Sequence, residues 1–359
     1  MKYKKRHIIL SLFLIVQILI IKLIKNKTLF IENDYSKSIY LYISKTLRYI
    51  FGWVPFSVGD ILYTILSIYL LTLIFKLFYC RLRFFKLIIL KLFATFSVVF
   101  FIFNIFWGLN YYRLPLNEQL GFSNNNYTEE QLITITKKLI LKTNALQEEI
   151  TNSKHLPVVI PHSTKDVFLR TKSGFAAIHE KYDFPEYIPP SVKTSIYSTV
   201  LSYMGFSGYL NPFTNEAQVN YNIPIVSMPS TTSHEIAHQL GYAAENEANF
   251  ISFLACTHSE DIFFQFSGYY MAMRYCISNL YRNNPEAYDE IKKHLNVGVI
   301  ENMKIHREMN KKYDNDLLEP FIKDIYNGYL KANNQKNGIK SYSVMVKTLI
   351  NYHEKNPNF

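Results

Sequence analysis

Cysteine is scarce in this chain, and the few that occur are widely spaced. Cys80, Cys256 and Cys276 are the only three among 359 residues, and they form no Cys-x-x-Cys pair. They therefore exclude a cysteine-ligated metal site of the usual spacing and a scaffold stapled by disulfides. We expect small buried side chains. A Cys256–Cys276 disulfide stays open as an alternative, provided that this part of the chain lies outside the cytoplasm.

Features of nucleic-acid binding are also missing. The net charge is +11, from 39 Lys and Arg against 28 Asp and Glu, but no basic stripe with interleaved aromatic residues runs along the chain. The basic residues instead flank apolar runs, as Lys2, Lys4, Lys5 and Arg6 and as Arg81, Arg83 and Lys86. We therefore assign the charge to a membrane surface and predict no nucleic-acid partner.

Long apolar runs are present, but only in the first third of the chain. Residues 7–24, 60–79 and 87–107 each approach the roughly 20 residues that a membrane-spanning helix needs. The sequence thus predicts a transmembrane region of three spans at residues 1–113, with the lipid bilayer as partner, and a soluble domain at 114–359. A cleaved signal peptide is the alternative for the first run, but no small-residue cleavage site follows it.

The placement of Lys and Arg predicts the orientation. Both the N-terminus and the 80–86 link are basic, and short basic loops stay in the cytoplasm. With three spans, the soluble domain then lies outside the cytoplasm. We expect a multi-pass protein of the bacterial inner membrane.

Three features are expected at the membrane edge. The aromatic, amphipathic segment 38–56 is predicted to lie in the headgroup layer. Asp60 opens the second span, where its carboxylate is expected to stay hydrated. Trp107 closes the third span and is expected to act as an aromatic anchor.

Beyond residue 113 the pattern is mainly helical with a small sheet. Thr128 to Gln131 has the form of a capping box ahead of a helix that reaches about residue 150, and a second helix is expected from Ser163. Short strands are expected between Ser195 and Asn220. Within them, 211–220 is predicted to be an edge strand along which an extended peptide binds. The apolar run 262–280 contains Gln265 and Arg274, which favours a buried helix over a fourth span.

The chemistry is carried by His234-Glu235-Ile236-Ala237-His238, which is a His-Glu-x-x-His motif. On a helix, expected at about 231–241 with Gly241 as its stop, the two imidazoles lie one turn apart on one face. Imidazole nitrogens suit Zn²⁺, and the carboxylate of Glu235 is placed to take a proton from a metal-bound water. We therefore predict zinc as cofactor and Glu235 as general base.

A catalytic zinc needs a third protein ligand. Glu245 is our first choice, because Asn249 would lie one turn further on the same face and could hydrogen-bond a ligand histidine. Glu247 is the alternative. His258 stands too far along the helix to bind the same ion. For the oxyanion that peptide hydrolysis develops, Tyr269 is a possible donor.

The sequence resembles bacterial polytopic membrane proteins classed as domain-of-unknown-function family 3810, whose members look like gluzincin-type zinc metallopeptidases. The resemblance lies in residues 59–63, 107–111, 212–220, 234–239, 245–250 and 267–269. Glu245-Asn246-Glu247-Ala248-Asn249 is also similar to the Glu-x-x-Ala-Asp of the CAAX-processing and heat-shock membrane peptidases. That similarity favours Glu245, with Asn249 in place of the aspartate. The resemblance implies a zincin-like α+β metallopeptidase domain after the transmembrane helices.

Two alternative functions are therefore considered. One is a membrane-anchored zinc peptidase that hydrolyses peptide bonds of membrane-proximal or envelope proteins. The other is a metal-binding sensor or scaffold of the cell envelope that keeps the zincin fold without turnover. A transporter is disfavoured, because Lys22, Asp60 and Lys76 stand near the ends of the spans and not at their centres.

Overall fold

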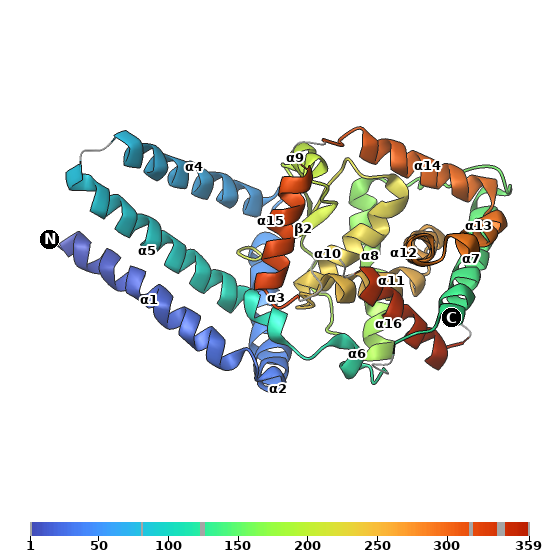
Figure 1. Ribbon diagram of the computed structural model, residues 1–359, viewed down its shortest axis with the longest axis horizontal. Coiled ribbons are helices and arrows are strands. Elements are labelled where there is room, and N and C mark those ends of the chain that lie inside the picture. The colour runs from blue at the N-terminus through green and yellow to red at the C-terminus, as the bar shows by residue number, and fades with distance from the viewer. Residues whose placement is uncertain (1, 80–81, 123–125, 316–318, 336–341, 358–359) are drawn as a thin grey trace.

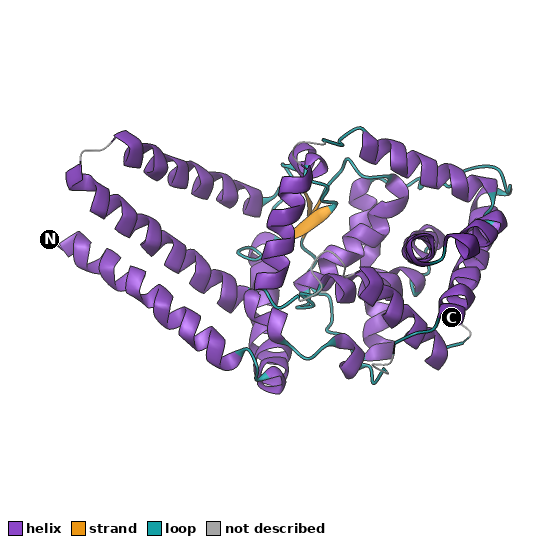
Figure 2. Cartoon of the chain, viewed as in Figure 1, coloured by secondary structure: helices purple, strands orange, loops and turns teal. Residues whose placement is uncertain are grey.

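The molecule consists of a three-helix bundle joined to a mainly helical domain (Figures 1 and 2). The computed structural model describes residues 2–79, 82–122, 126–315, 319–335 and 342–357. The helical domain holds one small sheet, and the N-terminus lies at the free end of the bundle (Figure 1). Mainly helical architecture with a small sheet was the expectation.

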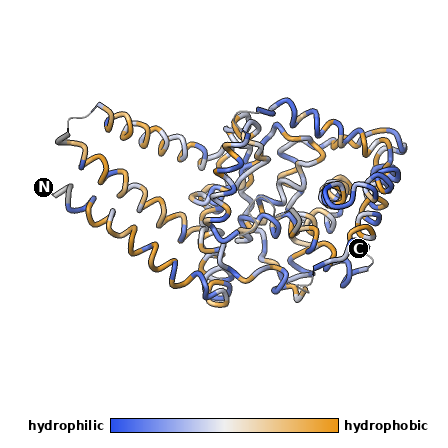
Figure 3. Tube along the Cα trace, viewed as in Figure 1, coloured by the Kyte–Doolittle hydropathy of each residue, from blue (hydrophilic) through white to orange (hydrophobic). Residues whose placement is uncertain are grey.

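The bundle is made of the three predicted apolar segments. They form α1 (Lys2–Ile24), α4 (Val58–Tyr79) and α5 (Leu82–Phe106). Each is long and apolar enough to cross a membrane, and between 6% and 22% of each apolar window is buried inside the protein. The remaining apolar surface, prominent along the bundle in Figure 3, is suited to lipid. The protein is therefore a membrane protein. Cys80 and Arg81, from the basic link used to predict orientation, lie outside the described residues.

A helical segment between the first and second spans crosses the end of the bundle (Figure 1). It comprises α2 (Thr28–Phe30), the π-helix η1 (Ile31–Ile39) and α3 (Tyr40–Phe51). One face of α3 is buried through Tyr40, Ser44 and Arg48, whereas Tyr42 and Tyr49 are exposed. This segment therefore packs on the helical domain with one side only.

The helical domain contains the following elements in chain order: η2 (Gly108–Tyr112), α6 (Leu116–Gln119), α7 (Glu129–Thr151), α8 (Thr164–Tyr182), β1 (Val192–Thr194), α9 (Ser198–Tyr203), β2 (Gly208–Asn211), β3 (Glu216–Val219), η3 (Ile225–Ser227), α10 (Met228–Gln239), α11 (Glu245–Thr257), α12 (Ile262–Asn283), α13 (Pro285–Ile291), η4 (Lys292–His294), α14 (Val297–Lys311), α15 (Glu319–Ala332) and α16 (Tyr342–Lys355). The capping box predicted at Thr128 and Gln131 is formed, and Ser163 caps α8 as expected.

α12 is a core helix and not a fourth span, as predicted. It packs against α7, α10, α11 and α16, and Phe264, Phe266 and Tyr270 are at most 1% exposed. Its Cys276 and the nearby Cys256 of α11 are both buried and free, so the disulfide left open by the sequence is not formed.

The sheet has the order β1-β3-β2, with β3 parallel to β1 and antiparallel to β2. The segment 211–220 was predicted to be an edge strand, and that prediction is wrong for its strand residues 216–219. Both edges of β3 are paired, because β1 (residues 192–194) lies along the edge that β2 leaves open. Strand propensity does not reveal this pairing between distant segments. The outer strand on the other side is β2.

Two expectations at the membrane edge are also wrong. Asp60 is fully buried, not hydrated: its Oδ2 accepts hydrogen bonds from the Ile196 amide at 2.6 Å and the Ser195 hydroxyl at 3.0 Å, and its Oδ1 accepts one from the Tyr209 hydroxyl. Trp107 is 6% exposed and packs inside the domain instead of anchoring at the water interface. Polar partners far along the chain satisfy both side chains, which removes their need for water or headgroups.

The start of α4 is tied to the sheet by a second carboxylate. Glu216 of β3 accepts hydrogen bonds from the backbone amides of Gly59 at 2.6 Å and Val58 at 3.2 Å. These are free donors at a helix N-terminus, where an anion is stabilised. The second span is therefore fixed to the domain by its first turn.

A buried ion pair links η1 to the exit of the third span. Arg113 donates two hydrogen bonds to Glu32, at 2.9 and 2.8 Å, and both side chains are at most 4% exposed. Lys37 also approaches Glu32, at 3.5 Å, but its side chain is 53% exposed. The buried Arg113 is therefore expected to stabilise the Glu32 carboxylate much more than the exposed Lys37 does.

We predict that Arg113→Met lowers the free energy of unfolding by about 3 to 5 kcal/mol, because it leaves Glu32 buried without its main partner. Lys37→Met is the matched control and should change it by less than about 1 kcal/mol. Denaturant titration of the detergent-solubilised protein measures both. Equal losses in the two variants would contradict the assignment.

Candidate metal centre

The His-Glu-x-x-His motif lies on α10, whose two ends are set by local sequence. Pro229 stands in the first turn, where its missing N–H costs no hydrogen bond. The helix ends after Gln239, and Gly241 has a φ of +90°, which strains any residue with a side chain. A Cβ at Gly241 would also lie 2.9 Å from the ring of Tyr40. The predicted glycine stop is therefore formed, and the helix begins three residues earlier than expected.

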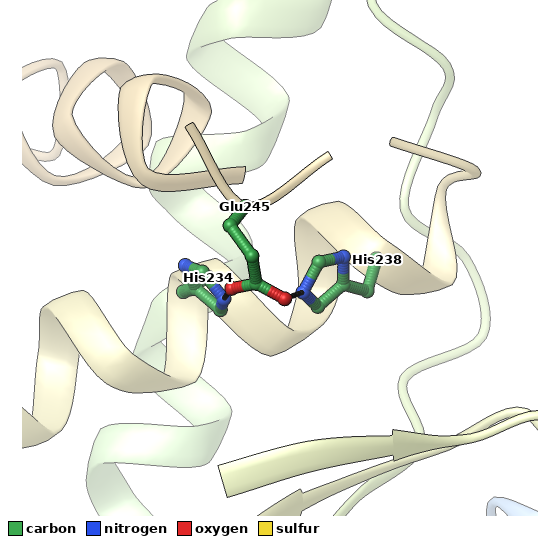
Figure 4. Close-up of side chains that lie close together, drawn as sticks. All are labelled: His234, His238 and Glu245. Carbon is green, nitrogen blue, oxygen red and sulfur yellow. Dashed lines mark ion pairs between the residues drawn. The ribbon is translucent and has the colours of Figure 1, made fainter. Parts of the chain in front are cut away.

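The turn after Gly241 brings α11 back beside α10, with Glu245 as its first residue. Figure 4 shows the carboxylate of Glu245 between the two imidazoles. Its Oε2 lies 3.3 Å from Nε2 of His234, and its Oε1 lies 3.7 Å from Nε2 of His238. One donor atom from each of these three residues lies within 4.8 Å of the others. The structure thus brings together the three side chains that the spacing singled out first.

Both histidines are held by a hydrogen bond at the other ring nitrogen. Nδ1 of His234 lies 2.9 Å from Oδ1 of Asn249, and Nδ1 of His238 lies 2.7 Å from the carbonyl oxygen of Tyr242. Because both partners are acceptors, each Nδ1 carries a proton, and each Nε2 faces the carboxylate of Glu245. Asn249 therefore forms the hydrogen bond with a histidine of the motif that the spacing predicts, and the hydroxyl of Tyr275 donates to the same Oδ1 at 3.2 Å.

The side chain of Glu235 extends from α10 toward β2. It is 4% exposed, and its Oε2 has no hydrogen-bond partner within the part of the chain that the structure describes. A Cβ at Gly208, the first residue of β2, would lie 2.6 Å from Oε1 of Glu235. The glycine thus leaves room for this carboxylate beside the sheet.

The remaining candidates lie elsewhere. Glu247 accepts a hydrogen bond from the Leu116 amide at 2.7 Å and lines a cavity of about 470 Å³ that neither histidine lines. His258 contacts Lys181 and Tyr182. Tyr269 packs edge-on against Phe253, with 5.8 Å between ring centroids, in the main hydrophobic core.

The tyrosine beside the cluster is one that sequence reasoning missed. Tyr326 of α15 donates a hydrogen bond to Oε1 of Glu245 at 2.9 Å. It lies 81 residues from Glu245 in an amphipathic helix that carries no motif. A chain with 28 tyrosines offers no local signal for this one.

Residues on the membrane side hold the end of α10. The Tyr40 hydroxyl donates to the carbonyl oxygens of Gln239 at 3.0 Å and His238 at 3.3 Å, and Trp107 Nε1 donates to the latter at 3.2 Å. Arg113 donates to the carbonyl oxygen of Gly241 at 2.9 Å. The carbonyl oxygen of His238 also accepts a hydrogen bond from the Gly241 amide at 2.9 Å. The side chains therefore add to the backbone bonds at this helix end and help to fix the position of His238.

The two histidines of the cluster differ in pKa. Burial disfavours a charge on His234, but its hydrogen bond to Glu245 and the nearby charge of Glu235 raise its pKa to about 9. Burial, helped by the charge of His234, lowers the pKa of His238 to about 4. Burial opposes ionisation of Glu245, yet the bond from His234 lowers its pKa to about 2. Glu245 is therefore an anion at neutral pH and His238 is neutral.

Burial raises the pKa of Glu235 to about 8, and the charge of His234 partly offsets the rise. A carboxylate with a pKa near neutrality can both take up and release a proton, which is the property that a general base needs. The donor set beside it, two imidazole nitrogens and one carboxylate, matches the His₂Glu set used for catalytic Zn²⁺. The residues thus fit a divalent cation in type and proximity.

Comparison with known proteins gives a family but no characterised relative. No curated protein and no solved structure matches the chain. A family model described as protein of unknown function (DUF3810) matches residues 35–350. The match includes α3, the second and third spans and every residue of the cluster. The chain therefore belongs to the DUF3810 family.

Proposed function

We propose that this protein is a membrane-anchored zinc-dependent peptidase that hydrolyses peptide bonds of membrane-proximal or envelope proteins. The observation that carries the proposal is the convergence of His234, His238 and Glu245 within 4.8 Å of one another, next to the buried Glu235. A cluster of metal-binding side chains beside a carboxylate of raised pKa is a candidate hydrolytic site. The gluzincin-like domain expected from the sequence belongs to the same proposal.

His234, His238 and Glu245 would hold the metal through two Nε2 atoms and one carboxylate. Bound zinc supplies a water of lowered pKa, about 7 in known hydrolases, and polarises the substrate carbonyl. Glu235 would take the proton of the attacking water on its carboxylate and deliver it to the leaving amine. Its Oε2 has no hydrogen-bond partner among the described residues and is therefore available for this task.

Tyr326 and β2 would serve the substrate. The Tyr326 hydroxyl stands at the cluster and, unlike Tyr269, can reach an oxyanion formed there. β2 is one of the two outer strands of the sheet and begins beside Glu235, so an extended peptide could pair with it as an added strand. The predicted inner-membrane location, with the helical domain outside the cytoplasm, would direct the site to envelope proteins.

We predict that zinc binding distinguishes the two glutamates of α11. Glu245→Gln should remove stoichiometric zinc from the purified full-length protein, as should His234→Ala, because each deletes one proposed ligand. Glu247→Gln is the matched control: it lies two residues away, keeps an acceptor for the Leu116 amide, and should retain zinc. Elemental analysis after dialysis provides the measurement. Zinc retained in Glu245→Gln and lost in Glu247→Gln would reverse the assignment.

Asn249→Ala should weaken zinc binding by about 10- to 100-fold, because it removes the acceptor that orients His234. Asn249→Asp keeps an acceptor at that position and should bind zinc at least as tightly as the unmodified protein. Competition with a fluorescent chelator gives both affinities. Equal affinities in the alanine and asparagine proteins would remove Asn249 from the site.

Glu235→Gln should abolish hydrolysis while keeping zinc, since the substitution deletes the base and none of the ligands. The expected loss in kcat is about 10² to 10⁴-fold. A quenched fluorescent peptide library, incubated with the zinc-loaded protein in lipid nanodiscs, reports cleavage. Zinc-loaded unmodified protein that cleaves no member would sink the peptidase proposal and favour the sensor or scaffold.

A further inference from the structure

α15, the helix that reaches the candidate metal centre through Tyr326, has an apolar ridge on its outer face. Phe321 and Ile325, one helical turn apart, are 65% and 58% exposed, and Tyr329 continues the row at 39%. Charged Lys323 and Asp324 flank the row. Such an arrangement is typical of a helix that lies in the plane of a membrane surface.

A second face of α15, about 100° around the helix from this row, is packed on the protein, and Tyr329 at the end of the row also directs its hydroxyl to the protein. Leu330 is 1% exposed, and Tyr326 contacts the ring of Phe206 at a centroid distance of 4.8 Å. The hydroxyls of Tyr329 and Tyr111 lie 3.1 Å apart, and Tyr111 belongs to η2, directly after the third span. These contacts place α15 at the level where that span ends.

α3 lies at the same level. In Figure 1 both helices run across the end of the bundle, steeply inclined to the three spans. The outer face of α3 and the turn after it expose Tyr42 (75%), Tyr49 (58%), Ile50 (51%) and Trp53 (79%). Trp and Tyr concentrate where hydrocarbon meets headgroups.

We propose that α3 and α15 form one lipid-contact surface in the headgroup layer, with the bilayer itself as the occupant of both apolar faces. The three spans fix the height of the membrane, and both helices contact the end of the third span: α3 packs against α5, and Tyr329 of α15 contacts Tyr111 just beyond it. Leaving this surface in water would forgo roughly 25 cal/mol for each Å² of apolar area. A surface that is already at membrane height needs no other partner to cover it.

The inner sides of both helices hold the candidate metal centre. Tyr40 of α3 binds the carbonyl end of α10, and Tyr326 of α15 binds Glu245. The cluster is therefore held between two helices that rest on lipid. Resting on the proposed function, this placement makes the substrate a chain segment that lies in, or emerges from, the bilayer surface.

Tryptophan quenching by brominated phospholipids tests the lipid contact without requiring zinc or turnover. The chain has two tryptophans, of which Trp53 is exposed and Trp107 is buried. In phosphatidylcholine–phosphatidylglycerol vesicles, bromines near the headgroups should quench Trp53 more strongly than bromines at the bilayer centre. Trp53→Phe leaves Trp107 alone and should lose that quenching.

In the Trp53→Phe background, Phe321→Trp and, separately, Ile325→Trp place the probe on α15. Each should regain shallow quenching. Tyr281→Trp is the matched control, because Tyr281 is similarly exposed at 60% but lies near α13, at the end of the domain away from the spans (Figure 1). It should remain unquenched.

Absence of quenching at both α15 probes would overturn the proposal and point to a protein partner or a second copy on that face. Stronger quenching from the bilayer centre would also overturn it, since α15 would then insert and not lie flat. Either result leaves the peptidase proposal standing, because the zinc and cleavage measurements are independent of it.

Discussion

The carbonyl end of α10 is the point on which the arrangement of the cluster depends. A helix leaves its last carbonyl groups without partners inside the helix, and in a buried position each must find a donor elsewhere. Here Tyr40, Trp107 and Arg113 supply those donors, and all three come from the membrane side of the molecule. His238 lies within this last turn, so its position is set by residues that the spans hold in place.

The boundary in composition near Arg113 is not a boundary in packing. Asp60 and Glu216 fix the first turn of α4 to the sheet, and Arg113 joins η1 to the turn between α10 and α11. These three polar side chains are internal, although Asp60 and Arg113 stand at the ends of spans in the sequence. The spans therefore do more than tether the domain, because parts of them and of their connections complete its interior.

The sequence was informative where the determining interactions are local. The capping box at Thr128, the N-cap at Ser163, the glycine stop at Gly241 and the pairing of His234 with Asn249 all involve residues within 15 positions of one another. Local sequence and helical periodicity are enough to predict them. The preference for Glu245 over Glu247 belongs here too, since two residues along a helix point to nearly opposite sides, and the structure puts only Glu245 beside the histidines.

The sequence was uninformative where partners come from distant segments. The residues around Asp60 give no indication that Ser195 and Tyr209 are its partners, so its carboxylate at the end of a span was predicted to be hydrated. The inner position of β3 depends on β1, which pairs across some 25 residues. Tyr326 reaches Glu245 only because α15 folds back over the domain. The pattern located the second span and β3, but it placed the strands between residues 195 and 220 and so missed β1 at Val192–Thr194. Tertiary contact decided the role of each element.

The residues that contact the C-terminal end of α10 precede it in the chain and are synthesised first. Tyr40 precedes Gln239 by 199 positions and Trp107 precedes His238 by 131. A ribosome makes the chain from its N-terminus, so the first two spans and their connecting helix are synthesised well before the motif emerges. α10 therefore folds against segments that were synthesised before it, and a chain whose spans do not insert lacks the surface against which His234 and His238 are positioned.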